Sequence, residues 1–341
     1  METSGIKYTP KDFKSENAVR WCPGCGDFAV LNCIHKAMAE VGIKPHETAV
    51  ISGIGCSSRL PYYMNTYGFH GIHGRACAIA TGVKVANPDL SVWVATGDGD
   101  ALAIGGNHFI HTVRRNVDLN IVLLNNRIYG LTKGQYSPTT ARGAVTKSSP
   151  YGTVEDPFNP AELCFGARGR FFGRAIDTDL KNQVDVMVEA AKHKGTSVIE
   201  VLVNCVIFND GIHKSITEKE WKADNTITLQ QGEKMIFGKD NNKGIVLDGW
   251  NLKAVTIGEN GYTIDDVLTH DATTPDNTLQ LKLAKMSLED GLPVALGVIR
   301  NAPEISYDEA FEKQIDDLQG GKPKKSLREF LLNSANVWEV K

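Results

Sequence analysis

The chain has 341 residues, of which 42% are hydrophobic, and its 37 basic and 40 acidic side chains nearly cancel. This length accommodates one large α/β domain with an appendage, and the balanced charge offers no basic surface for nucleic acid or a membrane. The amino terminus lacks the apolar core of a signal peptide and no apolar run spans a bilayer, so we expect a cytoplasmic protein. Seven cysteines in a reducing compartment favour metal or redox roles over disulfides.

The first strong motif is WCPGCG at residues 21–26. Proline and glycine between Cys22 and Cys25 predict a tight turn that aims both sulfurs the same way, as a zinc ion or an iron-sulfur cluster requires. An amphipathic helix is predicted to follow and to end at Gly42. Cys33 lies within this helix, and we expect it to pack in the core.

A short strand, TAVIS at 48–52, then leads into the glycine-rich loop GIGCSSR. A cysteine in a loop directly after a strand, here Cys56, is expected at the carboxyl edge of a sheet. Residues 62–70 are aromatic and predict irregular structure, and residues 73–87 predict a helix of small residues. Cys77 in that helix has alanine on both sides, which favours a core position.

The central stretch reads as a βαβ unit, with strands at 91–96 and 119–124 and a helix at 105–115. Gly-Asp-Gly ends the first strand, paired asparagines end the second, and the second polar turn predicts another helix after it. Neighbouring parallel strands place Asp98 and Asn126 at one edge of the sheet. Carboxylate and amide oxygens suit Mg²⁺, and the glycines allow a diphosphate to approach the backbone.

Residues 137–160 lack periodicity, and so long a loop is often a functional flap or a contact surface. Two further helix and strand pairs are predicted between 159 and 204, with Cys164 on an apolar helical face. Cys205 follows the last of these strands and is expected at the functional edge. The thiols able to converge there are Cys22, Cys25, Cys56 and Cys205. They would complete a [4Fe-4S] cluster or a zinc site, and a purely structural zinc ion remains an alternative.

Beyond Cys205 the sequence is less informative. We predict a domain over residues 1–210 and a partly helical C-terminal extension over 211–341. Within the extension, residues 276–290 predict a helix, 292–300 a strand, and the stretch after 307 two amphipathic helices. The KPKK run is typical of a solvated helix approach.

The motifs WCPGCG, GIGCSSR, HGRA, GDGD and NNRIYGLTKGQ occur in this order between Tyr8 and Asp210. In this pattern the chain resembles the β subunits of 2-oxoacid:ferredoxin oxidoreductases, most closely the 2-oxoglutarate enzymes. Val206 stands where many relatives have proline. The resemblance implies a doubly wound, mostly parallel α/β sheet of the thiamine diphosphate-binding fold with a C-terminal extension.

The resemblance also implies a reaction, the oxidative decarboxylation of 2-oxoglutarate to succinyl-coenzyme A with electrons passed to ferredoxin. Thiamine diphosphate would be bound through Mg²⁺, held by Asp98, Asn126 and the carbonyl of Ile128, and the four thiols named above would hold a [4Fe-4S] cluster. The residues expected to surround the cofactor are Ile54, Gly55, Cys56, Ser57, His73, Gly97, Asp98, Gly99, Asp100, Asn126, Ile128, Tyr129 and Leu131.

Three side chains are expected near the reacting atoms. Arg59 and His73 are the cationic candidates for the acid end of the substrate, and Leu131 is a candidate for apolar support near the reactive ring. The chain has no second thiamine-type domain to supply the activating carboxylate, so an α subunit is expected to provide it. A ferredoxin-type cysteine run is also missing, so electrons are expected to leave to external ferredoxin, directly or through another subunit.

Four alternatives remain open from the sequence. The substrate could be pyruvate or a branched-chain 2-oxo acid, which a panel of substrates would distinguish. The chain could be a non-redox thiamine decarboxylase with structural zinc, or a metal-binding subunit without catalysis, which metal analysis and cofactor binding would separate. The Gly-Asp-Gly turn could also be a Rossmann-like turn that binds nothing.

Overall fold

The computed structural model describes residues 7–321, 326–333 and 338, and its centre is an eight-stranded sheet. Neighbouring strands are parallel except β11 and β5, which run antiparallel, so the predicted mostly parallel α/β fold is confirmed. In sheet order the strands are β2 (Tyr67–His70), β1 (Thr48–Ser52), β3 (Ser91–Gly97), β4 (Leu119–Asn125), β6 (Thr196–Leu202), β5 (Phe171–Ile176), β11 (Val294–Asn301) and β7 (Thr226–Leu229).

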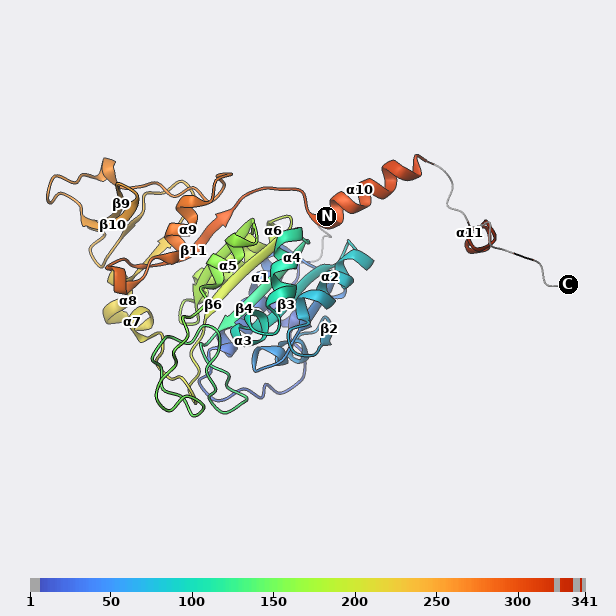
Figure 1. Cartoon of the computed structure of the whole chain (residues 1–341), viewed down its shortest axis with the longest axis horizontal. Helices are drawn as coiled ribbons and strands as arrows, with labels where there is room; N and C mark the ends of the chain where they lie inside the picture. Colours follow the sequence, from blue (N-terminus) through green and yellow to red (C-terminus); the bar gives the residue numbers. More distant parts are fainter. Residues whose placement is uncertain (1–6, 322–325, 334–337, 339–341) are drawn as a thin grey trace.

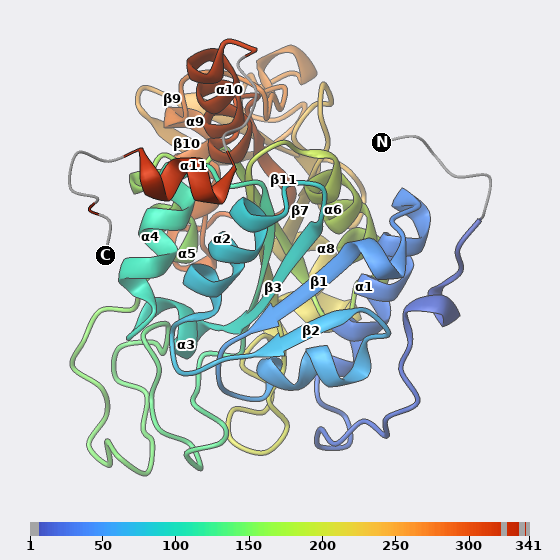
Figure 2. The ribbon, with the colours of Figure 1, turned by 90° about the vertical axis from the view of Figure 1, so that its right-hand side faces the viewer.

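Helices cover both faces of this sheet (Figures 1 and 2). The central strand β4 is buried along its whole length, and its apolar residues alternate between two cores: Ile121 and Leu123 enter one, Val122 and Leu124 the other. A strand covered on both faces reads as a continuous apolar run, which is why the sequence revealed it. The first core contains α2 (Ala76–Ala86), α4 (Gly106–Arg115), α5 (Pro160–Gly166) and α9 (Thr278–Lys285), and the second contains α1 (Asp27–Val41) and α6 (Leu180–Lys192).

Two local predictions are wrong. The helix predicted after Asn126 is absent, and residues 126–159 contain neither helix nor strand in the structure. Here Asn126 Oδ1 accepts a hydrogen bond from the amide of Ile128 (3.1 Å) and Arg127 has a left-handed backbone (φ 54°), both of which oppose a helix start. Residues 67–70 form the edge strand β2 rather than irregular structure. All four residues of β2 are exposed, so no alternation of apolar and polar residues marked it.

The predicted C-terminal extension is not separate from the sheet. Its strands β7 and β11 complete the eight-stranded sheet, so the sheet crosses the boundary predicted at residue 210. The predicted helix at 276–290 and strand at 292–300 appear as α9 and β11, and the KPKK run lies outside the described residues. The remaining elements here are α7 (Lys214–Thr217), α8 (Lys219–Asn225), a small antiparallel sheet of β8 (Ile236–Phe237), β9 (Lys243–Asp248) and β10 (Asn251–Thr256), α10 (Tyr307–Gln319) and α11 (Leu327–Leu332).

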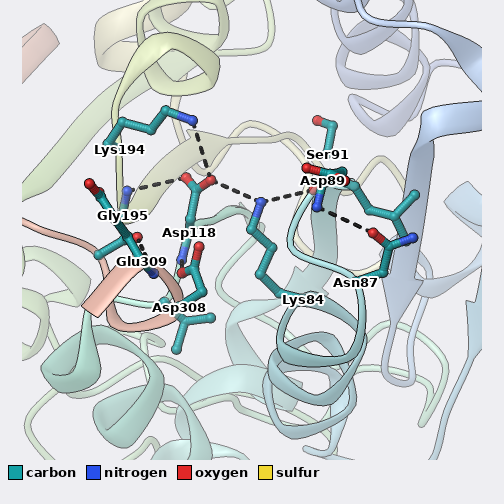
Figure 3. A network of polar contacts seen from close by, with 12 residues as sticks. Lys84, Asn87, Asp89, Ser91, Asp118, Lys194, Gly195, Asp308 and Glu309 are labelled. Atoms are coloured by element: carbon teal, nitrogen blue, oxygen red, sulfur yellow. Dashed lines mark hydrogen bonds and ion pairs between the residues drawn. The ribbon is translucent and has the colours of Figure 1, made fainter. Parts of the chain in front are cut away.

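A network of polar contacts around the ion pair of Lys84 and Asp118 ties the start of α10 to the amino edge of the sheet (Figure 3). Lys84 Nζ lies 2.9 Å from Asp118 Oδ2, and the backbone amide of Asp118 donates to Asp308 Oδ1 (2.9 Å) in the first turn of α10. The amide of Gly195 donates to the other oxygen of Asp118 (3.2 Å). From this anchor α10 points away from the sheet (Figure 1). The network lies at the edge opposite to the polar turns Gly97–Gly99 and Asn125–Asn126.

In the described part of the chain, no helix is long and apolar enough to cross a bilayer.

Candidate functional site

A cavity of about 320 Å³ lies at the carboxyl edge of β1, β3 and β4. Every residue that the resemblance assigned to the cofactor lines it, from Ile54 in the first loop to Leu131 in the last. This convergence follows from the topology, because the three strands are parallel neighbours and their following loops meet at one edge. The lining residues that sequence reasoning missed are Asp27, Ile104, Leu124, Gly130, Thr132 and Gln135.

Asp98 is the one carboxylate of the Gly-Asp-Gly motif itself, and it begins the short helix α3 (Asp98–Leu102). Its side chain is buried, and its Oδ2 accepts hydrogen bonds from Ser137 Oγ (2.5 Å) and Thr139 Oγ1 (2.6 Å). Burial raises the pKa of Asp98 despite these two bonds. The long loop predicted at 137–160 is therefore fixed to this site at its start, a connection that the sequence did not reveal.

Gly99 allows a close approach between the Gly-Asp-Gly turn and Tyr129. A Cβ at position 99 would lie 2.0 Å from the tyrosine ring, and the tyrosine hydroxyl donates to the carbonyl of Gly99 (3.0 Å). Burial raises the pKa of Tyr129 to about 12, so the phenol stays protonated and remains a donor at neutral pH. Ser57 Oγ lies beside the same turn, 3.4 Å from where a Cβ at Gly97 would be, and it is buried with no hydrogen-bond partner in the described part of the chain.

Asp100 has a structural role in the cavity wall. Its Oδ1 accepts from the backbone amide of Gly74 (2.7 Å) and its Oδ2 from Thr96 Oγ1 (2.9 Å). A Cβ at Gly53 would lie 1.8 Å from Oδ2, so this glycine is needed for the carboxylate to fit. Because both oxygens are engaged, Asp100 joins the loops after β1, β2 and β3 around the cavity.

The turn after β4 presents Asn126 and Ile128 to the cavity. The left-handed residue between them, Arg127, reverses the chain so that both neighbours face the same side. Asn209 Nδ2 donates to the carbonyl of Asn126 (3.0 Å) and holds the turn against the segment after β6.

The four cysteines predicted to converge line a second, adjacent cavity of about 130 Å³. They come from the N-terminal turn, the loop after β1 and the segment after β6. Cys33, Cys77 and Cys164 are buried in the two cores, so their predicted core positions are confirmed. The two cavities have a common wall made of Cys56, Asn126, Gly130 and Leu131.

Hydrogen bonds hold the three cysteine-bearing segments together. The amide of Cys25 donates to the carbonyl of Cys22 (3.0 Å), closing the predicted tight turn. Trp21 Nε1 donates to the carbonyl of Cys56 (2.7 Å), and the amide of Gly26 donates to the carbonyl of Asn204 (3.2 Å), beside Cys205. These bonds hold the N-terminal turn, the loop after β1 and the segment after β6 side by side around the cavity.

Burial shapes the chemistry of the thiols and of Asp27. It raises the pKa of Cys25, and it raises the pKa of Cys56 to about 11, with the Asp27 carboxylate adding to both shifts. Without a bound cation these groups are therefore thiols at neutral pH. Asp27 is 2% exposed and lines the first cavity, and burial raises its pKa to about 7 although the nearby Cys25 side chain acts to lower it.

The geometry of the cysteine cavity differs from that of a single-metal site. Among the described residues, no three His, Cys, Asp or Glu side chains are grouped closely enough to hold one metal ion. A zinc ion gathers four sulfurs at about 2.3 Å from one point. An iron-sulfur cubane binds each cysteine at a different iron atom and so needs wider spacing.

The three side chains expected near the substrate are divided between the cavities. His73 lines the first cavity, and Leu131 lines both. Arg59 lines only the cysteine cavity, where its Nη1 donates to the carbonyl of Arg20 (3.2 Å). The structure therefore does not bring Arg59 and His73 together, because the loop after β1 turns Arg59 away from the first cavity.

Comparisons with known proteins agree with this geometry. Residues 53–201 match the family model described as the thiamine pyrophosphate enzyme, C-terminal TPP binding domain. The chain is 45% identical to the 2-oxoglutarate oxidoreductase subunit KorB of Mycobacterium tuberculosis over 97% of its own length and 88% of that protein. It is 48% identical to the 2-oxoglutarate synthase subunit KorB of Archaeoglobus fulgidus over 54% of its length and 69% of that protein.

A solved structure is also similar. It is described as 2-oxoglutarate:ferredoxin oxidoreductase from Magnetococcus marinus with 2-oxoglutarate, coenzyme A and succinyl-CoA bound, and it matches with a TM-score of 0.77 and 32% identity. The match covers 98% of this chain and 97% of that one. Since the similarity to the M. tuberculosis subunit extends over nearly the whole chain and well above 30% identity, the protein belongs to the family of 2-oxoacid:ferredoxin oxidoreductase β subunits.

Proposed function

We propose that this chain is the β subunit of a 2-oxoglutarate:ferredoxin oxidoreductase, which converts 2-oxoglutarate and coenzyme A to succinyl-coenzyme A and CO₂ and passes the electrons to ferredoxin. The observation that carries the proposal is the common wall of the cofactor cavity and the cysteine cavity. A decarboxylation centre and an electron acceptor must lie close together for electrons to leave one at a time. The relatives named for 2-oxoglutarate support this substrate over pyruvate or a branched-chain acid.

The first cavity fits a magnesium-bound thiamine diphosphate. Asp98, Asn126 and the carbonyl of Ile128 would hold Mg²⁺, because they offer hard oxygen ligands beside a glycine turn open to the diphosphate. The buried Ser57 hydroxyl, which has no hydrogen-bond partner among the residues that the structure describes, would donate to a phosphate oxygen. Bound there, the cofactor supplies the electron sink that decarboxylation of a 2-oxo acid requires.

The remaining lining residues would orient the cofactor and exclude water. Tyr129 packs against Gly99 and closes the turn around the diphosphate. Leu131 would support the reactive ring from the common wall, where an apolar group keeps water out. His73 is the lining residue we assign to the acid end of the substrate. Arg59 would reach the substrate only from the cysteine side of the wall, so we assign the acid end of the substrate to His73 rather than to Arg59.

The second cavity fits a [4Fe-4S] cluster held by Cys22, Cys25, Cys56 and Cys205. Hydrogen bonds hold together the segments that carry these thiols, and no three ligating side chains of the described residues are grouped closely enough for a single zinc ion, which supports a cubane. A cluster would stabilise the thiolates that burial disfavours, because the iron charge reverses the local pKa preference. The side-chain amide of Asn126 in the common wall would then help to set the potential of the cluster.

The working enzyme needs partners. A β subunit requires an α subunit, and we propose that this partner supplies the carboxylate that activates the aminopyrimidine of the cofactor. Ferredoxin is proposed to collect the electrons on the cysteine side, and coenzyme A to accept the succinyl group. The chain is proposed to act in the cytoplasm.

The test is anaerobic purification of the chain with its co-expressed α partner, followed by metal analysis and a visible spectrum. Iron with acid-labile sulfide, and bleaching of the broad absorption on addition of 2-oxoglutarate and coenzyme A, would support the proposal. Zinc without iron would refute the redox function. Bleaching by pyruvate but not by 2-oxoglutarate would refute the substrate.

A further inference from the structure

A third cavity, of about 400 Å³, lies behind the turn that presents Asn126 and Ile128. Its walls come from the ends of β4, β5 and β6, from the long loop after β4, and from α7 and the segment after α9. It does not include any residue assigned to thiamine diphosphate or to the cysteines. The function proposed above therefore leaves it unexplained.

Charged side chains line this cavity. Arg127, Arg174 and Glu200 lie in it, and Glu289 and Lys285 lie at its exposed rim. Arg174 and Glu200 are paired, with Nε 2.7 Å from Oε2 and both side chains at most 7% exposed. Asn125 Nδ2 donates to the other oxygen of Glu200 (2.8 Å), so each oxygen of this carboxylate accepts a hydrogen bond, and in the described part of the chain none of these comes from Arg127.

Arg127 carries a guanidinium that has no ion pair or hydrogen bond among the described residues, and the charges of Glu200, Asp98 and Glu289 act on it only from a distance. Within the described residues its hydrogen bonds involve only the backbone: its amide donates to Asn125 Oδ1 (3.3 Å), and its carbonyl accepts from Thr140 Oγ1 (2.7 Å) and Asn209 Nδ2 (3.3 Å). The guanidinium is left to face the cavity. A largely buried guanidinium without a partner is destabilising, and its planar fork matches the two oxygens of a carboxylate or phosphate.

Other cations near the cavity cannot take this role. Lys285 lies at the rim, 54% exposed, and is paired with Glu162 at 2.8 Å. His213 is buried, and burial together with the nearby Arg127 charge lowers its pKa to about 4, so it is neutral at physiological pH. Its Nε2 lies 3.3 Å from the carbonyl of Asn125. Among the described groups, Arg127 is thus the cation available to a ligand.

We propose that this third cavity is a binding site for a small oxyanion, a carboxylate- or phosphate-bearing metabolite, held by the forked guanidinium of Arg127. The cavity is within the size range of small-molecule sites. Because Arg127 stands between Asn126 and Ile128, an anion in this site contacts the back of the turn whose front faces the cofactor cavity.

The binding test uses the full-length chain and two probes, succinate and inorganic phosphate, at constant ionic strength. Isothermal titration should show saturable binding of at least one probe, which also decides between carboxylate and phosphate. Arg127→Gln should weaken it at least about tenfold, because a bidentate charge-assisted contact is lost. Arg127→Lys keeps the charge but loses the planar guanidinium, so its affinity for the probes should lie between those of the wild type and Arg127→Gln. Glutamine tolerates the left-handed backbone about as well as arginine.

The matched control is Arg142→Gln, in the same loop region. Arg142 is 58% exposed and paired with Asp156 (2.7 Å), outside the cavity, so its variant should bind the probes like the wild type. A thermal scan separates a ligand site from a structural role: without anion, Arg127→Gln should melt no lower than the wild type, because it removes an unpaired buried charge.

Three results would overturn the proposal: no saturable binding of either probe, undiminished binding by Arg127→Gln, or a lower melting temperature of that variant without anion. If the probes bound in the cofactor cavity instead, Arg127→Gln would bind them as well as the wild type does. The titration needs neither cofactor nor partner, so its failure would leave the proposed oxidoreductase function untouched.

Discussion

Replacement of Asp98 by asparagine is the most informative single change in the cofactor cavity. The amide oxygen can still accept the hydrogen bonds that Ser137 and Thr139 donate to Oδ2, at 2.5 and 2.6 Å. The negative charge is lost, and with it the carboxylate ligand proposed for Mg²⁺. Asp98→Asn therefore separates two effects of the buried charge: it lowers the stability of the chain without metal, and it contributes to binding of Mg²⁺.

The expected stability change follows from the direction of the pKa shift. Burial raises the pKa of Asp98 more than its two hydrogen bonds lower it, so the folded chain without metal favours the neutral form. For each unit by which burial raises the pKa of Asp98, the free energy of unfolding at neutral pH falls by about 1.4 kcal/mol. A neutral isostere recovers it, and about 1 kcal/mol raises the melting temperature of a large domain by about 2–4 °C.

The expected change in cofactor binding has the opposite sign. Loss of a group that only supports a ligand costs about 10–100-fold in metal affinity, so loss of the carboxylate itself should cost at least about 100-fold. Thermal scanning with and without Mg²⁺ and thiamine diphosphate measures both effects, on the chain co-purified with its partner. Wild type should melt higher when both are added, and Asp98→Asn should melt higher than wild type without them but show no further increase.

The control is Asp118→Asn at the opposite edge of the sheet. It leaves the buried Lys84 without a full partner, so the melting temperature should fall while the response to Mg²⁺ and thiamine diphosphate remains. If Asp98→Asn instead melted lower than wild type and still responded to both, the assignment of Asp98 as a buried metal ligand would be wrong.

Three further outcomes are expected. Cys56→Ala should abolish the broad visible absorption of the anaerobically purified complex and Cys77→Ala should keep it; loss in both, or in neither, would contradict the division of thiols into ligands and core. Gly99→Ala places a methyl group 2.0 Å from the Tyr129 ring, so cofactor affinity measured by titration should fall at least about tenfold, and unchanged affinity would mean that the ring is not needed to close the turn. Burial lowers the pKa of His35 to about 4, below the unfolded value near 6.5, so unfolding free energy from denaturant titrations should be highest above pH 6.5 and fall by up to about 1.4 kcal/mol per pH unit as the pH drops toward 4. His35→Leu should flatten that dependence, and an equally steep one would assign it to other groups.

Most regular elements were predictable because their signals are local. The continuous apolar run of β4 marks a strand buried on both faces, and Gly42 in a left-handed conformation ends α1 where the periodicity stops. The failures have physical reasons too. β2 is an exposed edge strand without alternation, and the turn after Asn126 is set by side-chain hydrogen bonds that a periodicity argument does not include.

The sequence by itself determined which residues carry the chemistry: two motifs at the ends of neighbouring parallel strands and a Cys-Pro-Gly-Cys turn. Parallel strands joined by helices always bring such ends to one edge, so the cofactor cavity followed from topology. Only the tertiary structure decided what surrounds them. Contacts between distant segments place Asp27 in the cofactor cavity, bring Thr139 to Asp98 and separate Arg59 from His73. They also leave the Arg127 guanidinium without an ion pair among the described residues, and no local pattern encodes any of these features.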